Sequence, residues 1–184
     1  MPVVVQPATQ PDKSAAKTAT AVMYCEANSG AIDGKTANGL VRHSEMYEIL
    51  SAIDSEKAGC DSGAVLGNEP NSIPVCRDLA DALAHAGGIP DDVIFGMARS
   101  SGRLSTTERG IVLEAISLGM NVVNGLHEFL SDDPQFAAAS AAMNVKILDV
   151  RKPRALKRLR TFSGRIAKVT CPKRCGTALH RKPR

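Results

Sequence analysis

The residues best suited to chemistry lie in short polar stretches that follow apolar runs. The first stretch, residues 26–39, contains Gly30, Gly34, Lys35 and Thr36 in the pattern Gly-x-x-x-Gly-Lys-Thr. This is one residue shorter than the phosphate-binding pattern G-x-x-x-x-G-K-[ST], in which backbone N–H groups cradle phosphate, the lysine contacts it and the hydroxyl binds Mg²⁺. A phosphate-binding loop is therefore one hypothesis for this stretch.

Two other interpretations of the same stretch remain open. Gly30, Gly34 and Gly39 do not match G-x-G-x-x-G, but Asp54 follows Gly34 by 20 residues, where the ribose-binding acid of a dinucleotide site belongs. Alternatively, Gly34 and Gly39 only permit tight turns and close packing of a helix on a sheet. The spacing by itself does not decide among the three.

A second group of candidates surrounds Arg103 and His127. Arg103, in a Ser-Ser-Gly-Arg loop, could bind a carboxylate or phosphate with two parallel hydrogen bonds, or it could be a solvated loop arginine. His127, beside Glu128, could be a general base or a ligand, although a lone histidine after a strand is more often structural.

The five cysteines suggest neither a disulfide framework nor a metal site. Cys171, Cys175 and His180 offer three zinc-type ligands with no fourth nearby, so we expect no metal site there. Cys25 ends an apolar run and is expected to be an inert thiol at the edge of the core. An odd, sparse set of cysteines is typical of reduced thiols, and we expect a cytoplasmic protein.

Alternating strand and helix signals indicate how these stretches are positioned. Six strands separated by helices predict a mostly parallel, doubly wound α/β sheet of the Rossmann-like class, with helices on both faces and strand order 3-2-1-4-5-6. Ser105 and Glu108 form a capping-box pattern. The expected strands are 20–25, 47–53, 73–76, 92–97, 121–123 and 145–150, and the expected helices are 35–43, 77–86, 105–118 and 131–142, the last capped by Ser131 or Asp132.

Charge and composition divide the 184 residues into three parts. Residues 151–184 carry 13 of the 23 Lys and Arg residues and none of the 19 acidic ones. We expect a flexible leader over 1–19, one domain over 20–153 and a basic linker or tail over 154–184. The leader lacks the pattern of a signal peptide, and no run of 18 apolar residues is present, so no membrane partner is expected.

Several stretches in the right order give the chain a family resemblance. These stretches are YCEANSGAIDGKTANGLVRHSEMYEI (24–49), IDS (53–55), NSIPV (71–75), GRL (102–104), NVVNGLHEFLSDDP (121–134) and DVRKP (149–153). Residues 20–153 resemble the N-terminal Rossmann-like domain of a bacterial and archaeal two-domain family of unknown function, some of whose members are described as D-glutamate N-acetyltransferases.

The resemblance implies a second domain with a phosphate-binding loop. It further implies ATP or GTP with Mg²⁺ in the intact family, acetyl-CoA in its acetyltransferases, and a homo-oligomer. The stretch FSGRIAKVTCPK (162–173) is similar to the linker that precedes that domain, whereas Gly176-Thr177 is followed by Ala178-Leu179-His180-Arg181 and not by Gly-Lys-Thr. We therefore expect a chain truncated before the phosphate-binding loop and inactive alone.

The favoured interpretation is a Rossmann-like ligand-binding domain of an acyltransferase-like, nucleotide-dependent enzyme. Its ligand would be a small anionic metabolite, D-glutamate-like by resemblance, or a nucleotide. The alternative is a nucleic-acid-binding module that uses the basic tail, which is disfavoured because Phe162 is its only aromatic residue. The expected ligand-binding residues are Glu26, Asn28, Gly30, Asp33, Gly34, Lys35, Thr36, Asn38, Asp54, Gly102, Arg103, Gly125 and His127, with no catalytic residue assigned.

Overall fold

The computed structural model describes residues 18–97 and 101–153. The chain divides into two compact units, Met1–Lys152 and Pro153–Arg184, and most of the second lies outside the described residues. The strands are β1 (Ala19–Tyr24), β2 (Tyr47–Ile53), β3 (Val75–Cys76), β4 (Asp92–Phe95), β5 (Asn121–Asn124) and β6 (Ile147–Asp149). The helices are α1 (Lys35–Arg42), α2 (Ser62–Val65), α3 (Leu79–Ala86), α4 (Thr106–Ser117) and α5 (Pro134–Met143), with 3-10 turns η1 (Ile32–Gly34), η2 (Ser55–Lys57) and η3 (Leu130–Asp132).

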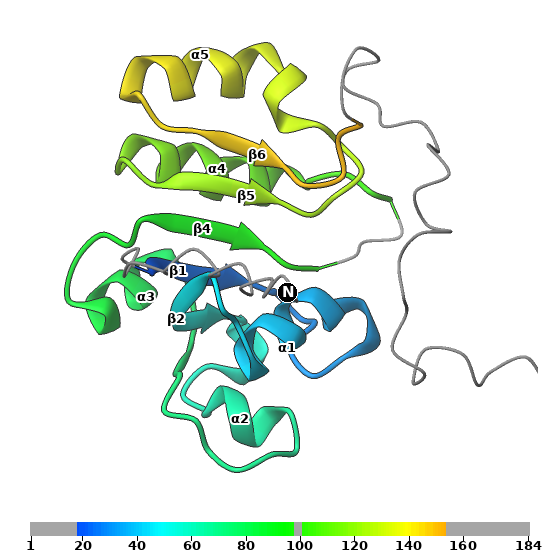
Figure 1. Cartoon of the computed structure of the whole chain (residues 1–184), viewed down its shortest axis with the longest axis vertical. Helices are drawn as coiled ribbons and strands as arrows, with labels where there is room; N and C mark the ends of the chain where they lie inside the picture. The colour runs from blue at the N-terminus through cyan, green and yellow to red at the C-terminus, as the bar shows by residue number, and fades with distance from the viewer. Residues whose placement is uncertain (1–17, 98–100, 154–184) are drawn as a thin grey trace, which may run out of the picture. The chain divides into compact units, whose positions relative to one another are not determined.

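The six strands form one sheet in the order β3-β2-β1-β4-β5-β6, with every neighbouring pair parallel. This confirms the predicted fold class and strand order. The direction of winding reverses between β1 and β4, and the crevice outside the carboxyl ends at such a reversal is where open α/β sheets bind ligands. The polar loops after β1, β4 and β5 all start from that edge (Figure 1).

The strands bury both of their faces, as parallel strands covered by helices must. Along β1, Val22 and Tyr24 belong to the core shared with α3, α4 and α5, whereas Ala21 and Met23 belong to the core shared with α1. Successive side chains of β1 therefore point to opposite faces of the sheet. Because both faces are buried, both sets of side chains are apolar, and the alternation is not visible in the sequence.

Helix caps explain where the helices begin. The Ser105 hydroxyl accepts from the Glu108 N–H, and the Glu108 carboxylate accepts from the Ser105 N–H, so the predicted capping box is confirmed. The last helix begins at Pro134 and not at Ser131, because the Asp133 side chain caps it and Leu130–Asp132 forms a separate 3-10 turn. Proline at the first helical position needs no N–H partner, so this start is favoured.

The other differences from the expected elements are at edges and turns. The third strand comprises only Val75–Cys76, and the helix after it begins at Leu79 because the Asp78 side chain accepts from the Asp81 N–H. The short helix α2 lies in a stretch where no helix was expected, and it is capped by Asp61. In the described part of the chain, no helix is both long and apolar enough to cross a membrane.

Candidate functional site

The loop after β1 is fastened to the end of β2 by the Asp54 carboxylate. One carboxylate oxygen accepts from the N–H of Ala27 at 3.2 Å and the other from the N–H of Ser29 at 3.0 Å. Asp54 is fully buried and also caps η2 through the Glu56 N–H. The Asp54 carboxylate thus holds the loop in shape, and its burial leaves no surface for a ribose.

Three further hydrogen bonds hold the same loop. The Glu26 carboxylate accepts from the Ser55 N–H at 2.9 Å and from the Ser55 hydroxyl, and the Lys57 ammonium donates to the Ser29 carbonyl. The stretches 24–49 and 53–55 that gave the family resemblance therefore contact each other, because Asp54 and Ser55 hold the loop after β1 in place.

Several backbone N–H groups of this loop donate to partners within the protein. The Asn28 N–H donates to the Cys25 carbonyl at 2.9 Å, and the Gly34 N–H donates to the Ala31 carbonyl at 3.2 Å. The Gly30 N–H donates to the Asn38 side chain at 3.1 Å. A phosphate-binding loop needs such amides free to face the ligand, so the geometry disfavours that hypothesis.

Gly34 is required for close packing. A Cβ at this position would lie 2.1 Å from the Asn28 carbonyl oxygen and 3.1 Å from the Cys25 sulfur. A Cβ at Gly39 would clash with nothing, because no atom lies within 4 Å of that position. The packing interpretation of the glycines is thus supported at Gly34 and not at Gly39.

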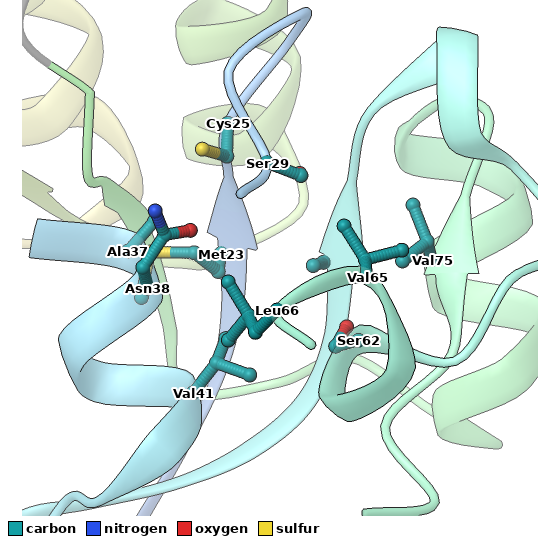
Figure 2. A pocket seen from close by; sticks show the side chains of 11 residues that line it. Met23, Cys25, Ser29, Ala37, Asn38, Val41, Ser62, Val65, Leu66 and Val75 are labelled. Carbon is teal, nitrogen blue, oxygen red and sulfur yellow. The ribbon is translucent and has the colours of Figure 1, made fainter. Parts of the chain in front are cut away.

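A small cavity lies beneath the loop, between β1 and helices α1 and α2 (Figure 2). Its volume of about 10 Å³ is far too small for a metabolite. Cys25, in its wall, is buried, and this burial raises the pKa of the thiol to about 11. Cys25 is therefore a core thiol and no nucleophile.

The other candidates of this loop lie on its outer side. Lys35 and Thr36, the first two residues of α1, are exposed, as is Asp33 in the preceding turn. The start of α1 is attached to the end of β4, because the Ala37 N–H donates to the Gly96 carbonyl at 3.0 Å. Lys35 is thus placed near the carboxyl edge of β4.

The second group of candidates does come together. Gly102, Arg103 and His127 line an open hollow of about 390 Å³ with Ser101 and Glu128, and its walls are mainly polar. We call it the Arg103–His127 hollow. None of the residues that line it comes from the loop 26–39, so this hollow holds only the second group of candidates.

Gly102 brings the two sides of the hollow into contact. Its φ of +65° is a left-handed conformation that glycine adopts without strain. A Cβ there would lie 3.0 Å from the Cβ of His127. The loop after β4 and the loop after β5 therefore touch at this residue.

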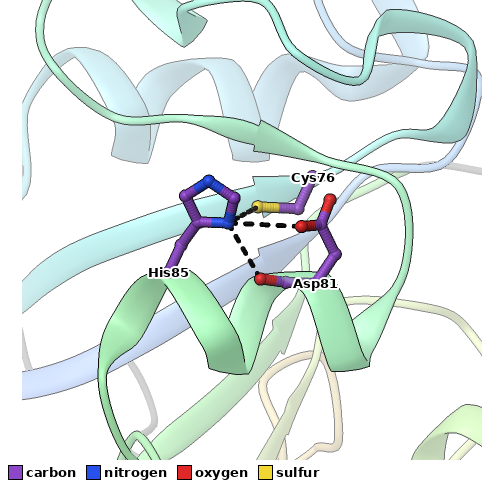
Figure 3. Close-up of side chains that lie close together, drawn as sticks. All are labelled: Cys76, Asp81 and His85. Atoms are coloured by element: carbon purple, nitrogen blue, oxygen red, sulfur yellow. Dashed lines mark hydrogen bonds and ion pairs between the residues drawn. The ribbon is translucent and has the colours of Figure 1, made fainter.

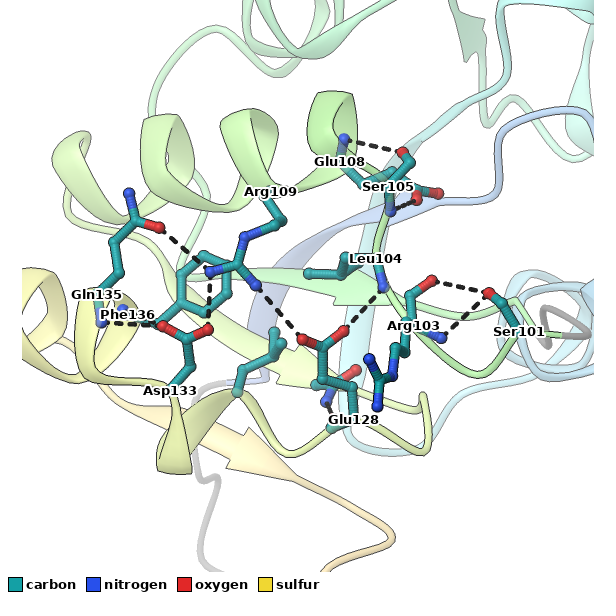
Figure 4. Close-up of polar contacts among 12 residues, drawn as sticks. Ser101, Arg103, Leu104, Ser105, Glu108, Arg109, Glu128, Asp133, Gln135 and Phe136 are labelled. Atoms are coloured by element: carbon teal, nitrogen blue, oxygen red, sulfur yellow. Dashed lines mark hydrogen bonds and ion pairs between the residues drawn. The ribbon is translucent and has the colours of Figure 1, made fainter.

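A charged network behind the hollow positions both loops (Figure 4). The Glu128 carboxylate accepts from the Leu104 N–H at 2.9 Å and lies 3.3 Å from the Arg109 guanidinium. Arg109 also pairs with Asp133 at 2.7 Å, and its guanidinium lies 4.4 Å above the centre of the Phe136 ring. Arg109 holds the pKa of the Asp133 carboxyl below its usual range.

A buried polar pair fixes the loop that carries His127. The Asn124 amide donates to the Asp149 carboxylate at 2.7 Å, and that carboxylate also accepts from the N–H groups of Leu130 and Ser131, each at 3.0 Å. Burial opposes ionisation of Asp149, but these hydrogen bonds outweigh it and lower its pKa. Gly125, one of the candidates, donates its N–H to the Phe95 carbonyl at 3.2 Å and so joins β5 to β4.

The remaining candidates line other hollows. Glu26 lies with Arg77 and Ser105 on a hollow of about 360 Å³, and Thr36 and Gly125 lie on an apolar one of about 420 Å³. Met46, Leu148 and Val150 line the apolar hollow and are more than half exposed, so it does not suit a small anion.

Sequence reasoning missed the residues that organise the hollow. Arg109 meets Glu128 and Asp133 across separations of 19 and 24 residues, and no local pattern predicts such contacts. A signal for Asp149 existed, since DVRKP was among the stretches that gave the resemblance.

The fold and the loops at the carboxyl edge define a Rossmann-like domain. Residues 55–153 match the family model described as "Domain of unknown function (DUF1611_N) Rossmann-like domain". This match covers more than half of the chain, and the chain belongs to that family.

Similar proteins extend the comparison. A DUF1611 family protein from Anabaena variabilis ATCC 29413 is similar in structure, with a TM-score of 0.70 and 27% identity, over 83% of this chain and 42% of that one. Two proteins named D-glutamate N-acetyltransferase are similar over 33% of this chain. The Pseudoalteromonas protein is 38% identical over 60 residues and the Tritonibacter scottomollicae protein 31% over 61. The matched part spans only 18% of each of these two relatives.

Proposed function

We propose that this chain is the ligand-binding domain of an acyltransferase-like, nucleotide-dependent enzyme acting on a small anionic metabolite of the D-glutamate type. The observation that carries the proposal is the Arg103–His127 hollow at the carboxyl edge of β4 and β5, where the fold class binds its ligands. The similarity to two proteins named D-glutamate N-acetyltransferase supports the choice of substrate class.

Arg103 is the proposed anion-binding residue. Its side chain is exposed on the hollow, and no ion pair joins it to another described residue. A guanidinium presents its N–H groups as a planar fork that matches a carboxylate, so a dicarboxylate amino acid offers it a suitable partner.

The network behind the hollow supplies the rigidity that such binding needs. The Glu128 carboxylate is held in place by the Leu104 N–H and by the Arg109 guanidinium, which it shares with Asp133. The backbone at residues 103 and 104 is thereby held while the Arg103 guanidinium remains available. His127 and the Lys35 ammonium at the start of α1 would add polar contacts and positive charge at the same edge.

Isothermal titration of the chain with D-glutamate tests the proposal. Arg103→Ala should weaken binding about tenfold to a hundredfold, because a hydrogen bond to a charged group contributes roughly 1.5–3 kcal/mol. The matched control is Lys146→Ala, which removes the same charge just before β6, at the opposite edge of the sheet. Equal affinity in Arg103→Ala and the parent would contradict the proposal, as would equal weakening in both variants.

Nucleotide and acyl donor belong to the proposal for the whole enzyme. Titration with ATP, GTP and acetyl-CoA, each with and without D-glutamate, identifies whether this domain contacts any of them. We expect D-glutamate to bind on its own, because the groups that line the hollow all come from the described domain.

A further inference from the structure

Three potential metal ligands converge between β3 and α3, away from the hollow described above (Figure 3). The sulfur of Cys76 lies 3.8 Å from Nδ1 of His85, and a carboxylate oxygen of Asp81 lies 3.3 Å from the same nitrogen. All three ligand atoms lie within 4.8 Å of one another. None of the three lines the Arg103–His127 hollow.

Local structure brings these side chains together. Cys76 ends β3 and turns its side chain toward the core shared with α3. Asp81 and His85 are four residues apart on α3, so they lie on one face of that helix. Cys76 is fully buried, whereas the side chains of Asp81 and His85 are 38% and 52% exposed, so solvent reaches the cluster from the helix side.

The geometry does not suit nucleophilic catalysis. A relay needs the nucleophile at one imidazole nitrogen and the carboxylate at the other. Here both lie at Nδ1, and Figure 3 shows the second ring nitrogen pointing away from the cluster. Burial, reinforced by the Asp81 charge, raises the pKa of the Cys76 thiol, which leaves it protonated and unreactive in the absence of a cation.

The same geometry does suit a tetrahedral cation. Zinc binds histidine nitrogen at about 2.0–2.1 Å, carboxylate oxygen at about 2.0–2.2 Å and thiolate sulfur at about 2.3 Å, so a tetrahedron places nitrogen about 3.3 Å from oxygen and about 3.6 Å from sulfur. The observed 3.3 Å and 3.8 Å are close to those separations. The Cys76 sulfur and the Asp81 oxygen lie within 4.8 Å of each other, and a bound cation would draw them to about 3.6 Å.

We propose that Cys76, Asp81 and His85 bind one divalent cation of the zinc type, with the fourth coordination position open to solvent. The cation would displace the thiol proton and place the imidazole proton on Nε2. Without a cation, a protonated Nδ1 can donate a hydrogen bond to the Asp81 carbonyl oxygen, which lies 3.0 Å away. Binding would link the two-residue edge strand β3 to α3 and so stabilise the fold.

Cobalt titration tests this site independently of any activity. Co²⁺ replaces Zn²⁺ at such sites and gives a thiolate-to-metal absorption band in the near ultraviolet. The parent should be the full chain carrying Cys171→Ser and Cys175→Ser, because those thiols are also candidate ligands. We expect one Co²⁺ per chain, a charge-transfer band, and a rise in melting temperature with Zn²⁺.

Variants decide whether these three residues are the ligands. Cys76→Ala should abolish the band, and His85→Gln should weaken Co²⁺ binding at least about tenfold. Cys60→Ser, which removes an exposed thiol elsewhere, should change neither. His85 lies on an exposed helix face, so its variant tests the site even if Cys76→Ala fails to fold. A band that persists in Cys76→Ala, unchanged affinity in His85→Gln, or no band in the parent would each overturn the proposal.

Discussion

At the residue scale, the Arg103–His127 hollow depends on a glycine that tolerates no side chain. Gly102 combines a φ of +65° with contact to His127, so Gly102→Ala should cost about 1–2 kcal/mol of stability from backbone strain. It should also weaken D-glutamate binding, because the added methyl displaces His127.

A second glycine provides the control for that substitution. Gly39 lies inside α1 with open space around it, so Gly39→Ala should be neutral or stabilising by up to about 1 kcal/mol. Urea unfolding of both variants, with titration of D-glutamate, measures the two effects. Equal stability of Gly102→Ala and the unchanged chain would contradict the strain argument.

Asp149 is a residue whose contribution to stability depends on pH. Its pKa is lower in the folded chain than in the unfolded one, so its stabilisation is complete above the unfolded value of about 3.9 and is lost as the pH falls through the folded value. Asp149→Asn should lose about 2 kcal/mol near neutral pH, because a charged acceptor of three hydrogen bonds is replaced.

The difference between Asp149→Asn and the unchanged chain is the quantity to follow with pH. Denaturant unfolding should show that this difference shrinks below about pH 4 as the native carboxylate becomes protonated. A difference that stays constant down to the acid limit of folding would contradict the assignment.

At the element scale, Arg109 links α4 to the loop after β5 and to the start of α5. Arg109→Met should lower the free energy of unfolding by about 1–2 kcal/mol. This figure is modest because the two ion pairs are partly exposed and solvent weakens them. Arg109→Lys should restore little, because a point charge cannot bridge Glu128 and Asp133 as a planar fork does. Denaturant unfolding measures both variants. If Arg109→Lys were as stable as the unchanged chain, the planar geometry of the guanidinium would be unimportant.

The loop after β1 yields a prediction about nucleotides. Because most of the N–H groups between Ala27 and Gly34 donate within the protein and Asp54 is buried, Mg²⁺–ATP should be hydrolysed only at background rate. Lys35→Ala should leave that rate unchanged. Turnover above background that disappears in Lys35→Ala would make this loop a working phosphate site.

How well the elements could be predicted depended on whether their signals were local. The strands were predicted from short apolar runs and α4 from its apolar stripe and its Ser105–Glu108 cap, and each of these signals is encoded within a few residues. The start of α5 was misplaced because Ser131, Asp132 and Asp133 are all plausible caps, and only the tertiary contacts of η3 select Asp133. The short helix α2 is held by Asp61 and has no periodicity to detect.

At the scale of the whole molecule, topology explains why some site residues were predictable and others were not. Parallel strands bring the loops after β4 and β5 to one edge, so Arg103 and His127 could be grouped from strand order alone. The Asp54 contacts that hold the loop 26–39, and the Arg109–Glu128–Asp133 network, join distant segments and follow no sequence pattern.

The central claim is that a small anionic amino acid binds at the Arg103–His127 hollow, and mapping amide shifts with ¹⁵N-labelled protein tests it most directly. On titration with D-glutamate, we predict that the largest shift changes fall on residues 101–104 and 126–128, and that Arg103→Ala abolishes them. Shift changes confined to the hollow beside Glu26 and Arg77, or spread evenly over the sheet, would contradict the claim.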